Sequence, residues 1–142
     1  MDLERALSFA RPLHQGVLVT LRRDGRPQLS NIMYLLDDER TARISVTAER
    51  AKVKNLSRDP RASLYVVAES FWQYLVLDGS AELSPVAAAA DDAVADELVE
   101  IYRALGGEHP DWGEYRRAMV DDRRLVIRLR VERAYGMLPD AG

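Results

Sequence analysis

Two cations stand at the start of a predicted helix, where electrostatics disfavours them. The apolar segment 44–47 ends at Thr47 and runs directly into residues 48–56, which we predict to be helical. Arg50 and Lys52 fall in the first turn, Lys54 lies one turn after Arg50, and only Glu49 offsets their charge. The positive end of a helix dipole favours acids there. A bound anion would resolve the conflict, because backbone N–H groups, a hydroxyl and two cations would converge on one ligand.

The alternative is a short surface helix whose cations are simply solvated, and the segment by itself favours neither interpretation. The cations stand out against an acidic background, since the net charge of the whole chain is −3. A chain with this balance is not expected to bind nucleic acid.

Several kinds of catalytic site are excluded by composition. The chain has no cysteine, which rules out disulfides, thiol nucleophiles and cysteine-ligated metals. Its two histidines, His14 and His109, lie far apart and neither has a partner at metal-ligand spacing, so we expect no metal. Neither a serine–histidine–acid set nor a glycine-rich phosphate loop is recognisable, and no catalytic residue can be named. If the protein is an enzyme, a cofactor would carry the chemistry.

Other side chains each allow a structural and a functional interpretation. Asn31 shares a predicted strand face with leucines and a methionine, so it is either buried with backbone partners or lines a ligand site. Trp72 and Tyr74 share another strand face and serve either as core or interface packing or as a wall against a flat ring. His109 precedes a short helix and is expected to be a cap or surface group.

Arginines near the C-terminal end are the remaining candidates. Segment 121–124 is predicted to be a solvated turn with weak local ion pairs. Arg128 and Arg130 lie on the last predicted strand, where one of them could reach a neighbouring anion site.

These residues are positioned by a mainly β architecture. At 142 residues the chain is expected to form one domain over 1–142. Helical spacing of apolar residues predicts helices over 3–9, 48–58 and 91–105, with a short one near 112–119. Alternation and turn signals predict strands over 16–21, 27–36, 42–47, 62–67, 72–83 and 125–131, with a bulge or bend at Gly79.

Six antiparallel strands close most economically into a small barrel, which removes exposed sheet edges. The interior of so small a barrel fills with side chains, so a ligand would bind outside it, in a groove or between subunits. No stretch approaches the roughly 20 apolar residues needed to span a membrane. The acidic start, with no apolar run after it, is unlike a signal peptide, and we expect a cytoplasmic protein.

The ordered set of motifs resembles one family along nearly the whole chain. The split β-barrel flavin and deazaflavin oxidoreductases, the superfamily named for pyridoxamine 5'-phosphate oxidase, have a similar first hairpin, phosphate-binding helix and following strands. The motifs that carry the likeness are segments 24–31, 50–52, 55–56, 58–62, 72–74, 79–81, 107–112, 115–116, 122–124 and 135–136. The likeness is greatest to the subgroup that uses coenzyme F420, an 8-hydroxy-5-deazaflavin.

The resemblance implies a six-stranded split barrel that forms a homodimer, with two cofactor sites between the subunits. On this basis Thr47, Arg50, Lys52 and Asn55 would hold the cofactor's phosphate and polar tail. The ring and ribityl region would be lined by Gln28, Ser30 and Asn31. Trp72 and Tyr74 would complete the site, from the same or the opposite subunit.

The implied function is an F420-dependent oxidoreductase that transfers hydride from the reduced cofactor to a small, electron-poor organic acceptor. The alternatives are an FMN-dependent oxidase or reductase on the same barrel, and a non-catalytic module that binds a flavin or a tetrapyrrole. Pyridoxamine phosphate oxidases are similar to one another in an Arg-Leu-x-Pro segment near their end. Residues 135–142 contain no arginine, so we expect an activity other than vitamin B6 oxidation.

Overall fold

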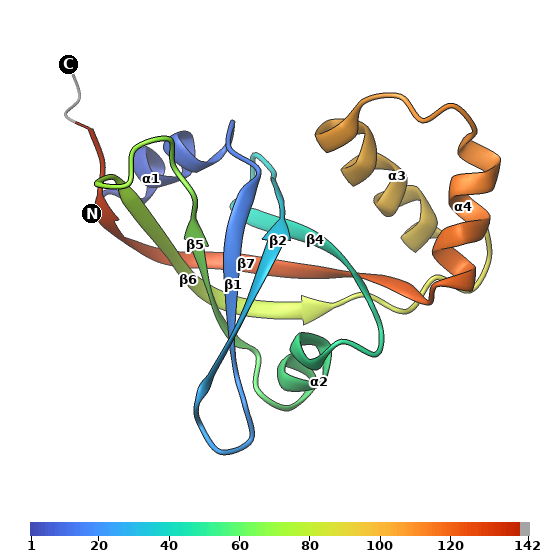
Figure 1. Cartoon of the computed structure of the whole chain (residues 1–142), viewed down its shortest axis with the longest axis horizontal. Coiled ribbons are helices and arrows are strands. Elements are labelled where there is room, and N and C mark those ends of the chain that lie inside the picture. Colours follow the sequence, from blue (N-terminus) through green and yellow to red (C-terminus); the bar gives the residue numbers. More distant parts are fainter. Residues whose placement is uncertain (140–142) are drawn as a thin grey trace.

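One curled antiparallel sheet forms the body of the protein (Figure 1). The computed structural model describes residues 1–139. Part of segment 135–142, which lacks the arginine of pyridoxamine phosphate oxidases, therefore lies outside the described residues. The strands follow the order β2-β1-β5-β6-β7-β4-β3. Their bounds are β1 Gln15–Leu21, β2 Pro27–Met33, β3 Leu35–Leu36, β4 Thr41–Thr47, β5 Arg61–Val66, β6 Tyr74–Leu83 and β7 Arg124–Met137. The helices are α1 Leu3–Ala10, α2 Ala51–Arg58, α3 Ala93–Gly106 and α4 Trp112–Asp121. A mainly β fold with inserted helices is therefore confirmed.

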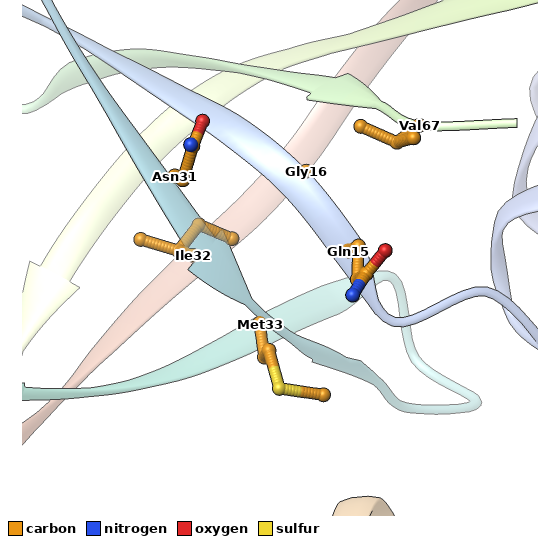
Figure 2. A pocket seen from close by; sticks show the side chains of 6 residues that line it. All are labelled: Gln15, Gly16, Asn31, Ile32, Met33 and Val67. Atoms are coloured by element: carbon orange, nitrogen blue, oxygen red, sulfur yellow. The ribbon is translucent and has the colours of Figure 1, made fainter.

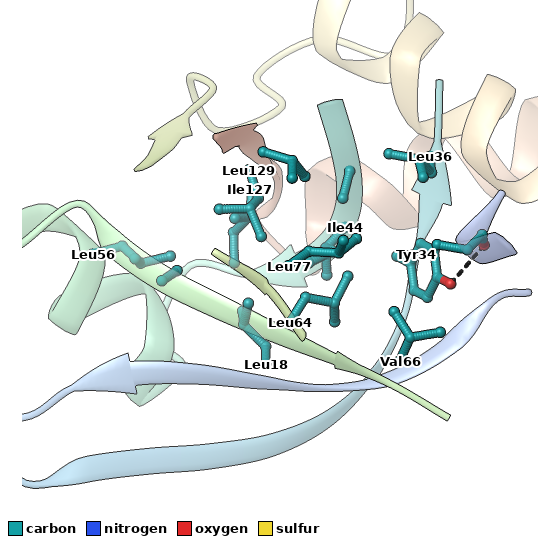
Figure 3. Packing of buried hydrophobic residues seen from close by; sticks show 14 of the residues in the cluster. Leu18, Tyr34, Leu36, Ile44, Leu56, Leu64, Val66, Leu77, Ile127 and Leu129 are labelled. Atoms are coloured by element: carbon teal, nitrogen blue, oxygen red, sulfur yellow. Dashed lines mark hydrogen bonds between the residues drawn. The ribbon is translucent and has the colours of Figure 1, made fainter. Parts of the chain in front are cut away.

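The prediction of a single return strand over 27–36 is wrong, and the difference explains how the sheet curls. The chain leaves β2 at Tyr34, whose side chain is fully buried and whose hydroxyl donates to the Ala10 carbonyl at 2.8 Å (Figure 3). β2 pairs with β1, whereas β3 pairs with β4 at the opposite edge. One segment thus joins both edges of the sheet, giving seven strands in the described residues rather than six. The result is a half-barrel of the split type.

The bulge predicted at Gly79 is confirmed in the long β6–β7 pair. The register shifts between Asp78 and Gly79, and a Cβ on Gly79 would lie 1.9 Å from the Arg130 carbonyl oxygen. Only glycine permits this close approach of two backbones. β7 is much longer than the predicted 125–131, and β6 begins at Tyr74 rather than at Trp72, which lies in the preceding turn.

Large aliphatic side chains fill the inside of the curl, as predicted. They come from alternate positions of β1, β4, β5, β6 and β7, because successive side chains of a strand point to opposite faces. Figure 3 shows this packing around Leu18, Ile44, Leu64, Leu77, Ile127 and Leu129, all at most 1% exposed. Binding surfaces therefore lie on the outside of the curl.

Helices α3 and α4 lie together at one end of the molecule and cover the outer face of β4 and β7 (Figure 1). Their apolar sides form a second buried cluster with Val126 of β7. The other members are Ala87, Val94, Leu98, Val99, Ile101, Tyr115 and Met119. Among residues 1–139, the helices are all too short or too polar to cross a membrane.

Candidate functional site

A cationic pocket of about 410 Å³ lies where β2, the end of β4, the start of α2 and the start of β7 meet. This cationic pocket is lined by Ser30, Asn31, Ile32, Met33, Ser45, Val46, Thr47, Arg50, Lys52 and Arg124. Three of these ten side chains carry positive charge and none is acidic.

The start of α2 supplies two of the cations, as the sequence predicts. Arg50 is the N-cap residue but its side chain caps nothing, and Lys52 follows inside the first turn, which holds no acid. Glu49, the one acid nearby in sequence, is paired with Arg123 at 2.8 Å. The first backbone N–H groups of a helix lack intrahelical partners. The helix start therefore presents free donors and two cations together.

Arg124 is the third cation, and sequence reasoning missed it. It was predicted to lie in a solvated turn, but it begins β7 and pairs in register with Thr47 at the end of β4. Arg128 and Arg130, for which the sequence allows contact with an anion site, lie further along the strand. Arg128 bonds to Glu97, and Arg130 is exposed beyond it. Counting back from Val126 in steps of two would have placed Arg124 on the same face, but only the β4–β7 register brings it beside Thr47.

Two buried polar atoms at the cationic pocket lack partners. The Ser30 hydroxyl and the Arg124 Nε have no hydrogen-bond partner among residues 1–139. Within the same residues no carboxylate forms an ion pair with Arg50, Lys52 or Arg124. Buried polar groups are normally hydrogen-bonded, so unpartnered donors at a pocket indicate a place for a ligand.

The charges in the cationic pocket act on one another. Partial burial lowers the pKa of Lys52 below its ordinary value of 10.5, and repulsion from Arg50 and Arg124 lowers it further. An anion placed between the three cations would remove this repulsion. The donor set therefore fits a phosphate group, with charged side chains, hydroxyls and helix N–H groups all present.

A second hollow of about 390 Å³ adjoins the cationic pocket at β2. Figure 2 shows its lining, with Asn31, Ile32 and Met33 on β2, Gln15 and Gly16 on β1, and Val67 beyond the end of β5. Residues 31–33 line both hollows. Asn31 is exposed at their junction, so the structure favours the ligand-lining alternative over a buried structural asparagine.

The structure brings together five of the nine residues predicted to bind a cofactor. Ser30, Asn31, Thr47, Arg50 and Lys52 all line the cationic pocket. Gln28 shares a strand face with Ser30 but lies nearer the hairpin turn, where its side-chain oxygen accepts from Arg22 at 3.2 Å.

Asn55 lies apart from the cationic pocket, on the side of α2 that packs on the sheet. It is 7% exposed, its Nδ2 donates to the Thr20 hydroxyl at 3.1 Å, and its Oδ1 accepts from Arg58 at 3.2 Å. The bond to Thr20 attaches α2 to β1, whereas the bond to Arg58 lies within the helix. Asn55 therefore supports the helix that carries Arg50 and Lys52.

Trp72 and Tyr74 also lie apart from the cationic pocket of their own chain. Tyr74 pairs with Met137 at one end of the 14-residue strand β7, whereas Arg124 lies at the other end. Trp72 is 77% exposed, and Tyr74 stacks on Tyr65 with ring centroids 6.4 Å apart. Trp72 lies in the turn that precedes β6, and Tyr74 is the first residue of that strand.

Both histidine rings contact backbone groups close to them. The backbone N–H of Asp111 donates to His109 Nδ1 at 2.9 Å at the start of α4, which agrees with the predicted capping role. His14 Nδ1 lies 3.2 Å from the Tyr34 carbonyl oxygen. In the part of the chain that the structure describes, no three His, Cys, Asp or Glu side chains gather as a metal site.

The curled antiparallel half-barrel, with the cationic pocket at the start of α2, belongs to a known class of split-barrel folds. Residues 4–138 match the pyridoxamine 5'-phosphate oxidase family, so the chain belongs to that family.

Solved structures share the fold at low sequence identity. An F420 reductase has a TM-score of 0.68 and 24% identity over 95% of this chain and 97% of that one. A conserved hypothetical protein from Mycobacterium tuberculosis has a TM-score of 0.70 and 22% identity, over 100% and 91% of the two chains. The heme storage protein HutZ from Vibrio cholerae has a TM-score of 0.67 and 17% identity, over 96% and 95%. These likenesses establish the fold, which supports different ligands.

Proposed function

We propose that this protein is an F420-dependent oxidoreductase that reduces a small, electron-poor organic acceptor. The observation that carries the proposal is the cationic pocket, in which Arg50, Lys52 and Arg124 have no acidic partner among the described residues. A phosphate-bearing cofactor would satisfy both unpartnered buried donors, Ser30 Oγ and Arg124 Nε. The choice of a deazaflavin rests on the motif resemblance and on the fold shared with an F420 reductase.

The roles of the side chains follow from their positions. Arg50, Lys52, Arg124 and Thr47 would hold the phosphate at the start of α2, and Ser30 and Asn31 would extend the site along β2. The hollow that continues past Asn31 to Gln15 and Val67 offers room for the rest of the cofactor (Figure 2). Asn55 would keep α2 in place through its bond to Thr20.

When bound in reduced form, the cofactor would supply two electrons as a hydride, and the acceptor would take up that hydride and one proton. The protein's contribution is to hold donor and acceptor in contact and to exclude water from between them. Solvent supplies the proton in this proposal, since the cationic pocket holds no aspartate, glutamate, histidine or tyrosine and Lys52 is assigned to the phosphate.

We also propose that the protein forms a homodimer through the outer face of β2, β1, β5, β6 and β7. Exposed apolar side chains run across this face, and contiguous patches of this kind mark interaction sites. The outer apolar face is made of Leu29, Met33, Tyr74, Tyr135 and Met137 on the strands, with Val67, Phe71 and Trp72 in the segment between β5 and β6, each between 37% and 80% exposed. Trp72 and Tyr74 would then contribute to the interface and through it to the partner's site.

The test of the cofactor is a fluorescence titration of the purified protein with F420 and FMN in parallel. Lys52→Ala should weaken F420 binding about tenfold or more, because it removes a charge-assisted contact worth roughly 1.5–3 kcal/mol. Lys54→Ala is the matched control, since Lys54 is exposed on the same helix and does not line the pocket. Both variants change the net charge equally, and only the first should lose affinity.

Preference for FMN in that titration would contradict the deazaflavin assignment and move the protein to the flavin branch of the family. Equal effects of Lys52→Ala and Lys54→Ala would contradict the site assignment itself. The dimer is tested separately by light scattering, where Leu29→Asp should shift the protein toward the monomer. An unchanged mass would contradict the proposed interface.

A further inference from the structure

An apolar hollow adjoins the cationic pocket beneath α3 and α4, and it is not needed for phosphate binding. It has a volume of about 360 Å³ and lies between these helices and the outer face of the sheet. We call it the apolar bay, and it is lined by Met33, Ser45, Ile101, Tyr102, Leu105, Gly106, Tyr115, Met119 and Arg124. Met33, Ser45 and Arg124 line both hollows, so the two adjoin at these residues.

The lining combines apolar surface with one directed cation. Ile101, Met119 and Tyr115 are buried in the cluster that attaches the helices to the sheet, while Tyr102 and Leu105 are half-buried. The Tyr115 hydroxyl donates to the Leu98 carbonyl at 3.0 Å, which leaves its ring as the surface offered to a ligand. Flat, apolar molecules bind in such sites.

Arg124 provides the polar contact of the apolar bay. Its Nη1 donates to the Ser45 hydroxyl at 3.3 Å, which fixes the guanidinium at the boundary between the two hollows. Its Nε is buried and has no partner among residues 1–139. A guanidinium carries five N–H donors, so those that the phosphate does not use can select a ligand with an electronegative oxygen at its edge, beside the apolar surface.

The walls of the apolar bay are held in place before any ligand binds. Glu97 of α3 accepts from Arg43 at 2.9 Å and from Arg128 at 3.1 Å, which ties the helix to β4 and β7. Arg116 of α4 pairs with Asp96 of α3 at 2.8 Å. The Tyr102 ring packs against Tyr115, with centroids 4.9 Å apart. A preformed hollow loses little ordering entropy on binding.

We propose that the apolar bay binds the acceptor, and that this acceptor is a flat, apolar, ring-bearing molecule with one anionic or carbonyl oxygen directed to Arg124. The inference rests on the proposed function and gives its substrate class. Strongly hydrophilic molecules such as sugars are excluded, because most of the bay offers them no hydrogen-bond partner. Arg124 would contact both ligands and so set their relative position.

The test uses two dyes of nearly the same shape, 8-anilinonaphthalene-1-sulfonate and its uncharged analogue N-phenyl-1-naphthylamine. The chain has two tryptophans, so Trp72→Phe leaves Trp112 as the single tryptophan donor. Trp112 lies 5.7 Å from Tyr102 and 5.6 Å from Tyr115, measured between ring centroids, and both tyrosines line the apolar bay. Energy transfer from Trp112 therefore reports that a dye has bound, and the variants locate it.

In this background, Leu105→Gln should weaken binding of both dyes at least fivefold. Its matched control is Ala104→Gln, an exposed neighbour on α3, which should change binding less than twofold. Arg124→Gln should weaken the sulfonate dye at least fivefold and the uncharged dye less than twofold. Leu105→Ala, a milder change, should act in the same direction as Leu105→Gln.

If neither Leu105 variant changed the affinity for the dyes, the proposal would be overturned and the dye would be assigned to the outer apolar face. Equal losses of the two dyes in Arg124→Gln would overturn the assigned orientation. The F420 titration of the wild-type protein decides the proposed function independently, because dye binding needs no cofactor. The dye titration and the F420 titration can therefore fail separately, and each result can be interpreted without the other.

Discussion

Two groups of cations lie on the same outer face of β4 and β7, and they differ in whether the fold supplies acids for them. In the first group Arg43 and Arg128 face each other across the two strands, and Glu97 and Asp37 bond to them. In the second, Thr47 faces Arg124, and the cations gathered there meet no carboxylate in residues 1–139. The same pair of strands thus carries one closed network and one open site.

The difference also appears in the acid–base properties of the two groups. Bonding to Glu97 raises the pKa of Arg128, although burial opposes the shift. Burial and the repulsion of Arg50 and Arg124 lower the pKa of Lys52. The first group stabilises the fold through its charges, whereas the second stays unbalanced until an anion binds. Substitutions in the two groups should therefore separate stability from binding.

The largest effect is expected from Glu97→Ala, which leaves Arg43 and Arg128 without their shared carboxylate. We expect a loss of about 2–3 kcal/mol in unfolding free energy, below the range for fully buried pairs because both arginines are partly exposed. Urea denaturation measures it. Glu82→Ala is the control, since Glu82 is 80% exposed and 3.6 Å from Arg128. Equal losses in the two variants would contradict the closed network.

The second effect is on binding, and it should leave stability unchanged. Arg124→Gln should weaken F420 about tenfold, because it removes a charge-assisted donor, equivalent to about 1.4 kcal/mol. Unfolding free energy should stay within about 0.5 kcal/mol, since removing one of three repelling cations costs little. Arg130→Gln, an exposed arginine on the same strand, is the matched control for both measurements. A stability loss as large as that of Glu97→Ala would contradict the comparison.

A smaller effect is expected from pH. Lys52 must be protonated to hold an anion, so affinity should fall several-fold as pH rises through its lowered pKa, before an ordinary lysine titrates. The stability of the protein without ligand should change with pH in the opposite direction. Because the folded pKa is below the unfolded value, stability should increase as pH rises from the lowered pKa toward 10.5.

Lys52→Arg isolates this effect, because arginine stays charged over the whole range. Titrating F420 into both proteins at a series of alkaline pH values cancels the ligand's own ionisation. The affinity difference should widen with pH. A constant ratio would show that Lys52 does not titrate at the site.

The smallest effect should come from Glu49→Ala. The Glu49–Arg123 pair is 64% exposed on both sides, and exposed pairs contribute about 0–1 kcal/mol. Removing this acid from the neighbourhood of the cationic pocket should raise F420 affinity by less than about threefold, with the gain lost at high salt. A clear loss of affinity would mean that Glu49 contacts the ligand.

Part of the site could be predicted from sequence because it is encoded locally. A strand that ends at Thr47 and a helix that begins with Arg50 and Lys52 need only neighbouring residues to reveal their conflict. Asn55 shows the limit of this reasoning. Its place in the motif suggested a ligand contact, but the packing of α2 turns its amide toward Thr20.

The sequence by itself determined the mainly β class, the Gly79 bulge, the amphipathic helices and the cations at the start of α2. Each of these depends on periodicity or on charges within a few residues. Only the tertiary structure decided where the chain crosses between the sheet edges at Tyr34, which arginine of β7 joins Thr47, and that α3 and α4 enclose an apolar bay. These features depend on strand register and on packing between distant segments, which no local pattern encodes.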